Sequence, residues 1–149
     1  MNMKNKVVNE TYDSQSGICT VTIQNKYGHF TGKAKCCPED MKNFSTYAGS
    51  RYAEIRASIK YAKFRLKQEK IKYQTIDNYL KDCLVIENEL GYDMSYNHYI
   101  NHALNLRKVY QNNIKHWEEI VNLLSNSISL QDEERQKVLN RSKQNNSSK

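Results

Sequence analysis

A basic segment without helix breakers decides the fold: residues 51–72 read RYAEIRASIKYAKFRLKQEKIK. Glycine and proline are absent from it, so nothing in the segment interrupts a helix. Apolar side chains recur every three or four residues, which is the spacing of one buried face of an α-helix. We therefore predict an amphipathic helix whose buried seam consists of Tyr52, Ile55, Ile59, Ala62 and Leu66.

The same segment carries a second row of side chains, beside the seam, that is entirely basic. Residues 51–72 contain eight Lys or Arg and two acidic residues, Glu54 and Glu69. A row of cations on one helix face can neutralise successive phosphates of a nucleic acid. The alternative is a solvated face whose lysine stems cover the core. The candidate binding residues for nucleic acid or for an acidic partner are Arg56, Lys60, Lys63, Lys67 and Lys70.

Upstream of this helix, residues 18–36 have the alternation of a β-hairpin. The first strand is rich in β-branched residues, and the alternation resumes after a turn around Tyr27-Gly28. A two-residue turn at Tyr27-Gly28 would place Cys19 opposite Cys36, whereas another register would separate them. Residues 1–17 are polar apart from Val7-Val8, and we expect them to form a flexible arm.

Downstream, the longest periodic signal is an apolar seam from Tyr99 to Leu124, which could also serve as the interface of a homodimer. Thr75, the segment Asp93–Asn97 and the box at Ser129–Asp132 are typical helix N-caps, and Gly91 is a typical C-cap. These caps predict breaks between helices. The predicted fold class is α+β, mainly helical: an N-terminal β-hairpin followed by three to four amphipathic helices. The predicted organisation is one domain over 18–141, with the hairpin at 18–36, helices at about 38–72, 75–90, 95–126 and 129–140, and a disordered tail at 142–149.

Composition supports this fold class and locates the charge. The chain has 149 residues with one proline and five glycines, which favours long helices over many short strands. Its net charge is +7, and residues 1–75 hold 14 of the 23 Lys and Arg but only six of the 16 acidic residues. No apolar run is long enough for a membrane span or a signal peptide. We expect a cytoplasmic protein with no membrane partner.

Catalytic and metal signatures are weak. The sequence contains no nucleophile elbow, phosphate-binding loop or paired carboxylates in an apolar context, so we do not expect an enzyme or a cofactor. His98 and His102 have the spacing of two metal ligands on one helix face, but no third ligand accompanies them. A thiolate cluster on the hairpin would lack the usual C-x-x-C spacing. We therefore expect no metal site from the hairpin residues Cys19, His29, Cys36 and Cys37.

One segment resembles a known group of proteins. Phe30-x-Gly32-x-Ala34-x-Cys36-x-Pro38-Glu39-Asp40, followed by a helix with Gly49, Ala53, Arg56, Ala57 and Lys60, resembles a hairpin-helix segment of small uncharacterised proteins of phages and mobile elements of Gram-positive bacteria. The resemblance implies an accessory protein of such an element. Small proteins of this kind include inhibitors of host defence, among them anti-CRISPR proteins. The implied partner is a Cas effector or another host nucleoprotein.

The functional hypothesis joins this resemblance to the basic row. We expect an inhibitor of a host defence nucleoprotein, of anti-CRISPR type, that binds through the basic helix face. Two alternatives remain: a regulator that binds DNA or RNA directly, and a homodimeric interaction module that acts through helix packing.

Overall fold

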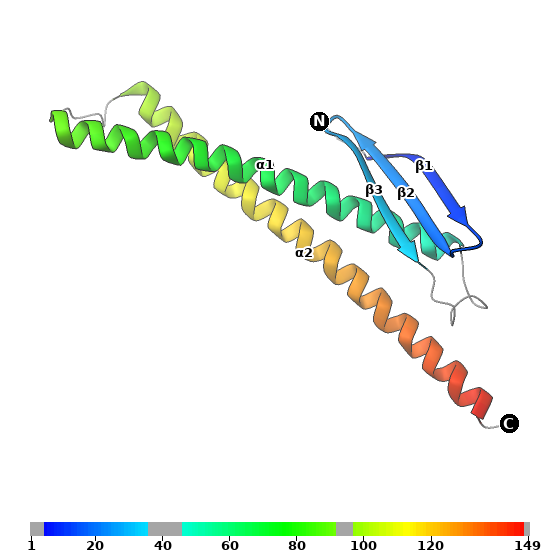
Figure 1. The fold of residues 1–149 in the computed structure, drawn as a ribbon. Coiled ribbons are helices and arrows are strands. Elements are labelled where there is room, and N and C mark those ends of the chain that lie inside the picture. Colours follow the sequence, from blue (N-terminus) through cyan, green and yellow to red (C-terminus); the bar gives the residue numbers. More distant parts are fainter. Residues whose placement is uncertain (1–4, 36–45, 92–96, 148–149) are drawn as a thin grey trace. The chain divides into compact units, whose positions relative to one another are not determined.

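The computed structural model describes residues 5–35, 46–91 and 97–147, and it contains a three-stranded antiparallel sheet followed by two long helices (Figure 1). The predicted α+β class is confirmed, but the predicted three to four helices are not, because the described residues form two. The elements are β1 (Lys6–Asp13), β2 (Ile18–Asn25), β3 (Gly28–Lys35), α1 (Thr46–Leu90) and α2 (His98–Ser147).

The expected flexible arm at 1–17 is wrong for its described part, because Lys6–Asp13 forms β1 and pairs antiparallel with β2. The turn that closes this pair uses ordinary turn chemistry. The Gly17 N–H donates to the Asp13 carbonyl at 2.8 Å, and the Asp13 carboxylate accepts the Gln15 N–H at 2.9 Å. Gly17 has φ +71°, which glycine adopts without strain. The strand was missed because its side chains are all exposed and a bulge at Val8 interrupts the alternation.

The predicted hairpin at 18–36 is present as β2 and β3, but its turn lies one residue earlier than expected. Asn25 pairs with Gly28, so Lys26 and Tyr27 form the turn, and the Asn25 side chain accepts the Tyr27 N–H at 2.8 Å. Cys19 therefore faces Ala34 and not Cys36, which lies outside the described residues.

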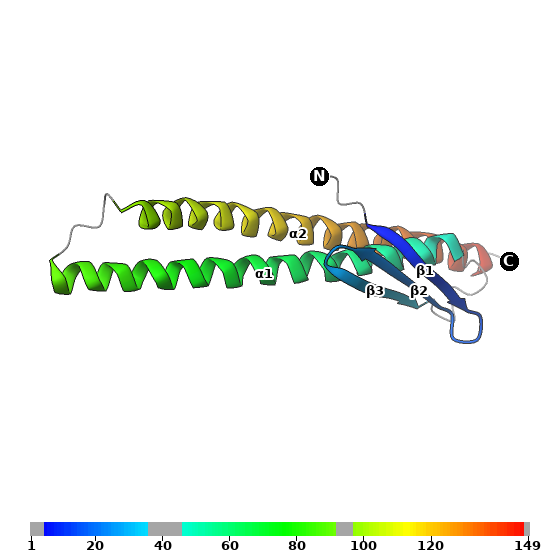
Figure 2. The same cartoon turned by 90° about the horizontal axis from the view of Figure 1, so that it is seen from above.

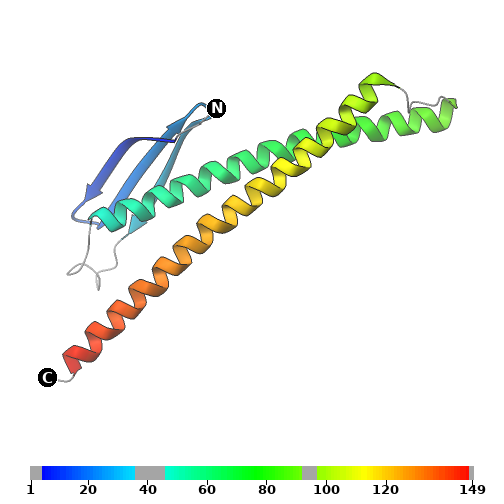
Figure 3. The same cartoon turned by 180° about the vertical axis from the view of Figure 1, so that it is seen from behind.

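The chain divides into two compact units, and the first consists of residues 1–61 and 121–149. Its core lies between one face of the sheet and the start of α1, which Figure 3 shows crossing the strands. Alternate residues of β2 point to this face, and three of them, Cys19, Val21 and Ile23, are almost completely buried, as expected of a strand with one buried face. The buried side chains of this core are Cys19, Val21, Ile23, Ala34, Ala53, Ala57 and Tyr61.

Where α1 comes closest to the sheet its residues are small, which corrects the predicted seam. Ala53 and Ala57 are completely buried, whereas the predicted Ile55 and Ile59 are only half-buried. A Cβ built on Gly32 of β3 would overlap the Ala53 carbonyl oxygen and the Ala57 backbone nitrogen. Helix and strand therefore approach so closely that only glycine and alanine fit between them.

The helix breaks predicted near residues 73–75 and 127–129 do not occur. Thr75 and Ser129 do not act as N-caps, because their hydroxyls donate to the carbonyls of Ile71 and Ser125, four residues earlier in the same helix, at 2.9 and 3.3 Å. The expected tail is also helical as far as Ser147. The predicted helix start at Pro38 lies outside the described residues.

The second unit, residues 62–120, contains parts of α1 and α2 that run antiparallel (Figure 2). The predicted caps at the ends of this hairpin are confirmed. Gly91 has φ +69° and its N–H donates to the Glu87 carbonyl at 2.9 Å, while Asn97 accepts the Tyr99 N–H at 2.9 Å. Among the described residues, neither helix has a stretch long and apolar enough to cross a membrane.

Candidate functional site

All five candidate residues lie on α1 and all are exposed, but they are distributed over both units. Arg56 and Lys60 belong to the first unit, and Lys63, Lys67 and Lys70 belong to the second. We therefore describe the two groups separately.

Arg56 has a structural contact at the edge of the sheet. Its guanidinium donates to the backbone carbonyl of Lys33 at 2.7 Å. β3 is an edge strand of the sheet. Lys33 pairs with Thr20 at a position without hydrogen bonds between β2 and β3, so the backbone N–H and C=O of Lys33 point away from β2. Arg56 thus occupies a hydrogen-bonding position that another strand could otherwise use. Lys60, one turn further along α1, is exposed and forms no salt bridge with a described residue.

In the second unit, Lys63, Lys67 and Lys70 form the candidate binding surface, which we call the lysine cluster. Within the described part of the chain, none of the three has a carboxylate within salt-bridge distance. At 1.5 Å per residue they extend over about 10 Å of helix axis. They lie at nearly the same angle around α1, because their spacing is four and then three residues.

Four other cations of α1 are different, because each has an acidic partner. The partners are Glu54 for Arg51 at 3.6 Å, Glu69 for Arg65 at 3.6 Å and for Lys72 at 3.4 Å, and Asp77 for Lys81 at 3.0 Å. The basic row predicted from the sequence therefore consists of cations that have no acidic partner among the described residues. Its neighbours on α1 are cations that neutralise acids of the same helix.

Glu69 is the feature of this unit that the sequence prediction missed. Its side chain is 2% exposed although it is charged. Its carboxylate accepts a hydrogen bond from the Asn113 amide of α2 at 3.2 Å and lies close to Arg65 and Lys72. A buried carboxylate is tolerated when cations and hydrogen bonds surround it. Glu69 therefore holds α1 and α2 together. The sequence pattern that could have indicated its burial is its position seven residues after the buried Ala62, on the same side of the helix.

Aromatic side chains of α2 complete this polar contact between the helices. The Arg65 guanidinium lies 5.4 Å from the centre of the Trp117 ring, and the Lys72 ammonium lies 6.0 Å from that of Tyr110. The sum of residue numbers is the same, 182, for both pairs and for Glu69 with Asn113, as antiparallel packing in one register requires. Tyr110 and Trp117 of the predicted Tyr99–Leu124 seam therefore pack against α1 of the same chain, whereas Tyr99 is 73% exposed.

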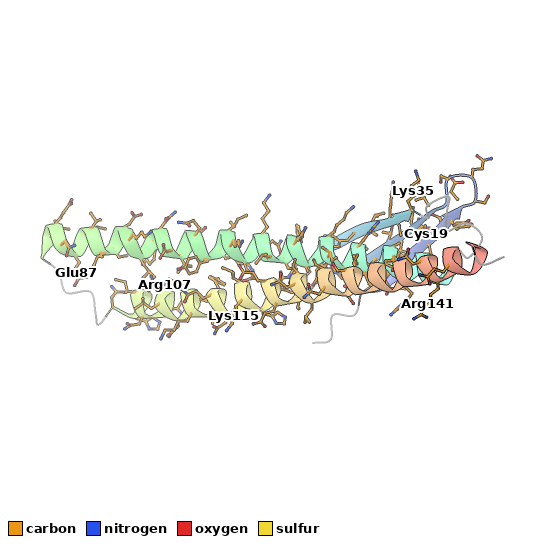
Figure 4. All side chains as sticks on the ribbon, turned by 90° about the horizontal axis from the view of Figure 1, so that it is seen from below. Cys19, Lys35, Glu87, Arg107, Lys115 and Arg141 are labelled. Carbon is orange, nitrogen blue, oxygen red and sulfur yellow. The ribbon has the colours of Figure 1, made fainter. Side chains whose placement is uncertain are left out.

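A second polar contact joins the helices at Asp77. Its carboxylate accepts from Lys81 at 3.0 Å and from Arg107 of α2 at 3.2 Å. Arg107 is labelled in Figure 4, on the part of α2 that runs beside α1. The hydrogen bond from Lys81 and the charges of Lys81 and Arg107 lower the pKa of Asp77 below its usual 3.8. The carboxylate is therefore ionised at neutral pH and contributes to the helix pairing.

The described residues do not bring the hairpin thiol and imidazole together. Cys19 lies on the buried face of the sheet, whereas His29 pairs with Gln24 on the opposite face. Burial raises the pKa of the Cys19 thiol, so it is protonated at neutral pH. Among the described residues, no group of three or more His, Cys, Asp or Glu side chains is placed to hold a metal ion. Cys36 and Cys37 lie outside these residues.

A pocket of about 260 Å³ lies between the helices of the second unit. Its wall is mainly aliphatic, with Leu80 and Leu84 from α1 and Ile100 and Leu104 from α2, and Cys83 also lines it. The lining contains no histidine that could activate the thiol. We assign this pocket no reaction.

Comparison with known proteins adds no relative: no protein-family model, no curated protein and no solved structure matches this chain.

Proposed function

We propose that this protein is a non-catalytic binding protein whose lysine cluster contacts an anionic surface, of nucleic acid or of a nucleoprotein. The observation that supports this is the division of the α1 cations. Arg51, Arg65 and Lys72 neutralise acids of α1, whereas the lysine cluster is exposed and has no carboxylate partner among the described residues.

The geometry of the cluster suits phosphates. Three ammonium groups along about 10 Å of a rigid helix can follow about three phosphates of one strand, which rises 3.4 Å per nucleotide. Lysine binds phosphate as a point charge and reads no base, so binding through the cluster alone would depend on salt and not on sequence.

In the first unit, Lys60 is a separate candidate for anion binding, since it too is exposed. Arg56 is less available, because its guanidinium is already bonded to the Lys33 carbonyl. We keep both in the proposed binding row and expect Arg56 to contribute least.

The finer proposal is inhibition of a host defence nucleoprotein, of anti-CRISPR type, in the cytoplasm of a bacterium. Its support is the resemblance of the hairpin-helix segment to proteins of phages and mobile elements, together with the exposed lysines. The alternative is a regulator that binds DNA or RNA directly. The two differ in whether free nucleic acid is sufficient as a partner.

The experiment uses fluorescence anisotropy with labelled duplex DNA, single-stranded DNA and RNA, followed by capture from phage-infected bacterial lysate with and without nuclease. Charge reversal of Lys63, Lys67 and Lys70 to Glu is expected to abolish binding at low salt. The control reverses Lys108 and Lys115, two exposed lysines of α2 in the same unit, and is expected to weaken binding much less. Equal binding by the cluster variant and the wild type, to nucleic acid and to captured nucleoprotein alike, would refute the proposal.

A further inference from the structure

Besides the lysine cluster, α1 carries in the second unit a stripe of exposed residues whose spacing is palindromic. Its six members are separated by three, four, seven, four and three residues, so the spacing is the same in both directions along the helix. All its members are exposed, and its apolar residues Phe64, Ile71 and Val85 are 37%, 58% and 51% exposed. We call this set the exposed stripe, and it consists of Phe64, Lys67, Ile71, Asn78, Asp82 and Val85.

The stripe lies on a different side of α1 from the contact with α2. At 100° per residue its six members fall within about 60° of one another around the helix axis. Arg65, Glu69 and Lys72, which contact α2, lie about 140° away. A partner on the stripe would therefore leave the pairing of α1 with α2 unchanged.

The charge of α1 reverses along its length. Arg65, Glu69, Lys72 and Asp77 contact α2, and Lys81 is paired with Asp77. Of the other exposed charges, Lys63, Lys67 and Lys70 lie before Gln74, whereas Asp82 and Glu89 lie after it. A second copy of this helix is complementary in charge if it runs antiparallel, because each basic half then faces an acidic half. A parallel copy would place like charges together.

We propose that the exposed stripe is the interface with a second copy of this chain, in which the two α1 helices pack antiparallel about a two-fold axis between Gln74 and Thr75. In a two-fold interface every contact occurs twice. If a residue of the first copy contacts a certain residue of the second copy, the same two residues also make contact with the copies exchanged. The residue numbers add to 149 in each of three pairs: Phe64 with Val85, Lys67 with Asp82, and Ile71 with Asn78 of the second copy.

Each pair is chemically suitable. Phe64 and Val85 are apolar at both ends of the stripe, and Lys67 with Asp82 forms an ion pair just inside each apolar end. Ile71 and Asn78 lie at the centre, where a polar residue in an apolar seam fixes the register of paired helices at a cost in stability. With few apolar residues per copy, the dimer is expected to be weak and to form at high protein concentration.

The dimer and the proposed anion binding share Lys67, while Lys63 and Lys70 lie at the border of the stripe. The inference does not rest on the proposed function, and the two fail separately. Anion binding is measured on the lysine cluster as described above, and the dimer is measured by sedimentation without any anionic partner.

The test is a charge swap followed by sedimentation equilibrium at low salt over a roughly hundred-fold range of concentration. The wild type is expected to pass from monomer to dimer over this range. Lys67→Asp and Asp82→Lys each place like charges together and are expected to weaken dimerisation at least ten-fold, whereas the double variant restores it. Lys115→Asp on α2 is the matched control for the charge change and is expected to dimerise as the wild type does.

Ile71→Asp tests the centre of the stripe, with Val109→Asp as its control because Val109 is 49% exposed on α2. Circular dichroism establishes that both variants keep their helices. We expect the Ile71 variant to be monomeric and the Val109 variant to dimerise. A wild type that stays monomeric, or a double charge swap that fails to restore the dimer lost in the folded single variants, would overturn the inference.

Discussion

Replacing Glu69 with leucine tests the polar contact between α1 and α2. Leucine has a similar size, so the change removes the charge and leaves little cavity. The Arg65 side chain, which is 11% exposed, then keeps its charge but loses the Glu69 carboxylate, at a cost of about 3 kcal/mol. The Asn113 amide also loses its acceptor, at about 1 kcal/mol. Lys72 is half exposed and adds little. We expect a total loss of about 4 kcal/mol.

The assay is urea unfolding followed by circular dichroism, with protein concentration fixed so that self-association does not alter the comparison. The double variant Arg65→Met with Glu69→Leu removes both charges and is expected to recover most of the loss, because apolar residues of similar volume can replace a buried ion pair. Lys115→Leu, an exposed change on α2, is the control and is expected to stay within about 0.5 kcal/mol of the wild type. A loss below about 1 kcal/mol for Glu69→Leu would refute the burial of this carboxylate between the helices.

Two further predictions concern the other contacts. Gly32→Ala is expected to destabilise the first unit by about 2 kcal/mol in the same unfolding assay, and Ala57→Gly should not rescue it, because the overlapping atoms are backbone atoms of α1; full stability of the single variant would contradict this. Asp77→Asn concerns pH: since the folded pKa of Asp77 lies below its usual 3.8, its stabilising effect is complete well above pH 3.8 and is lost as the pH falls through the folded pKa. The variant should therefore be less stable than the wild type at pH 7, and the difference should shrink as the pH falls below 3.8; a difference in stability that does not change with pH would contradict the assignment.

The sequence predicted the elements whose signals are local. The β2–β3 hairpin and the caps at Gly91 and Asn97 follow from turn and cap chemistry, which depends on a few neighbouring residues. Thr75 and Ser129 misled the prediction because a hydroxyl can either cap the start of a helix or donate to a carbonyl four residues earlier inside one. Which of the two occurs depends on whether the preceding residues are helical, and the hydroxyl residue alone does not show this.

Features that depend on tertiary contact were harder to predict. Ala53 and Ala57 form the buried face because Gly32 lets a strand approach them, and no periodicity of large apolar residues marks such a contact. The exposure of Lys63, Lys67 and Lys70 was implied by the helical pattern. Which cations of α1 are neutralised required the positions of the carboxylates, above all that of Glu69.

The most direct test of the proposed function is the salt dependence of nucleic-acid binding. Each phosphate neutralised on duplex DNA contributes a slope of about −0.9 to the plot of log K against log salt concentration. If the lysine cluster binds three phosphates, replacing Lys63, Lys67 and Lys70 with the neutral Gln should reduce the magnitude of the slope by about 2.7 relative to the wild type. The same slope for both proteins would show that the cluster does not contact the nucleic acid.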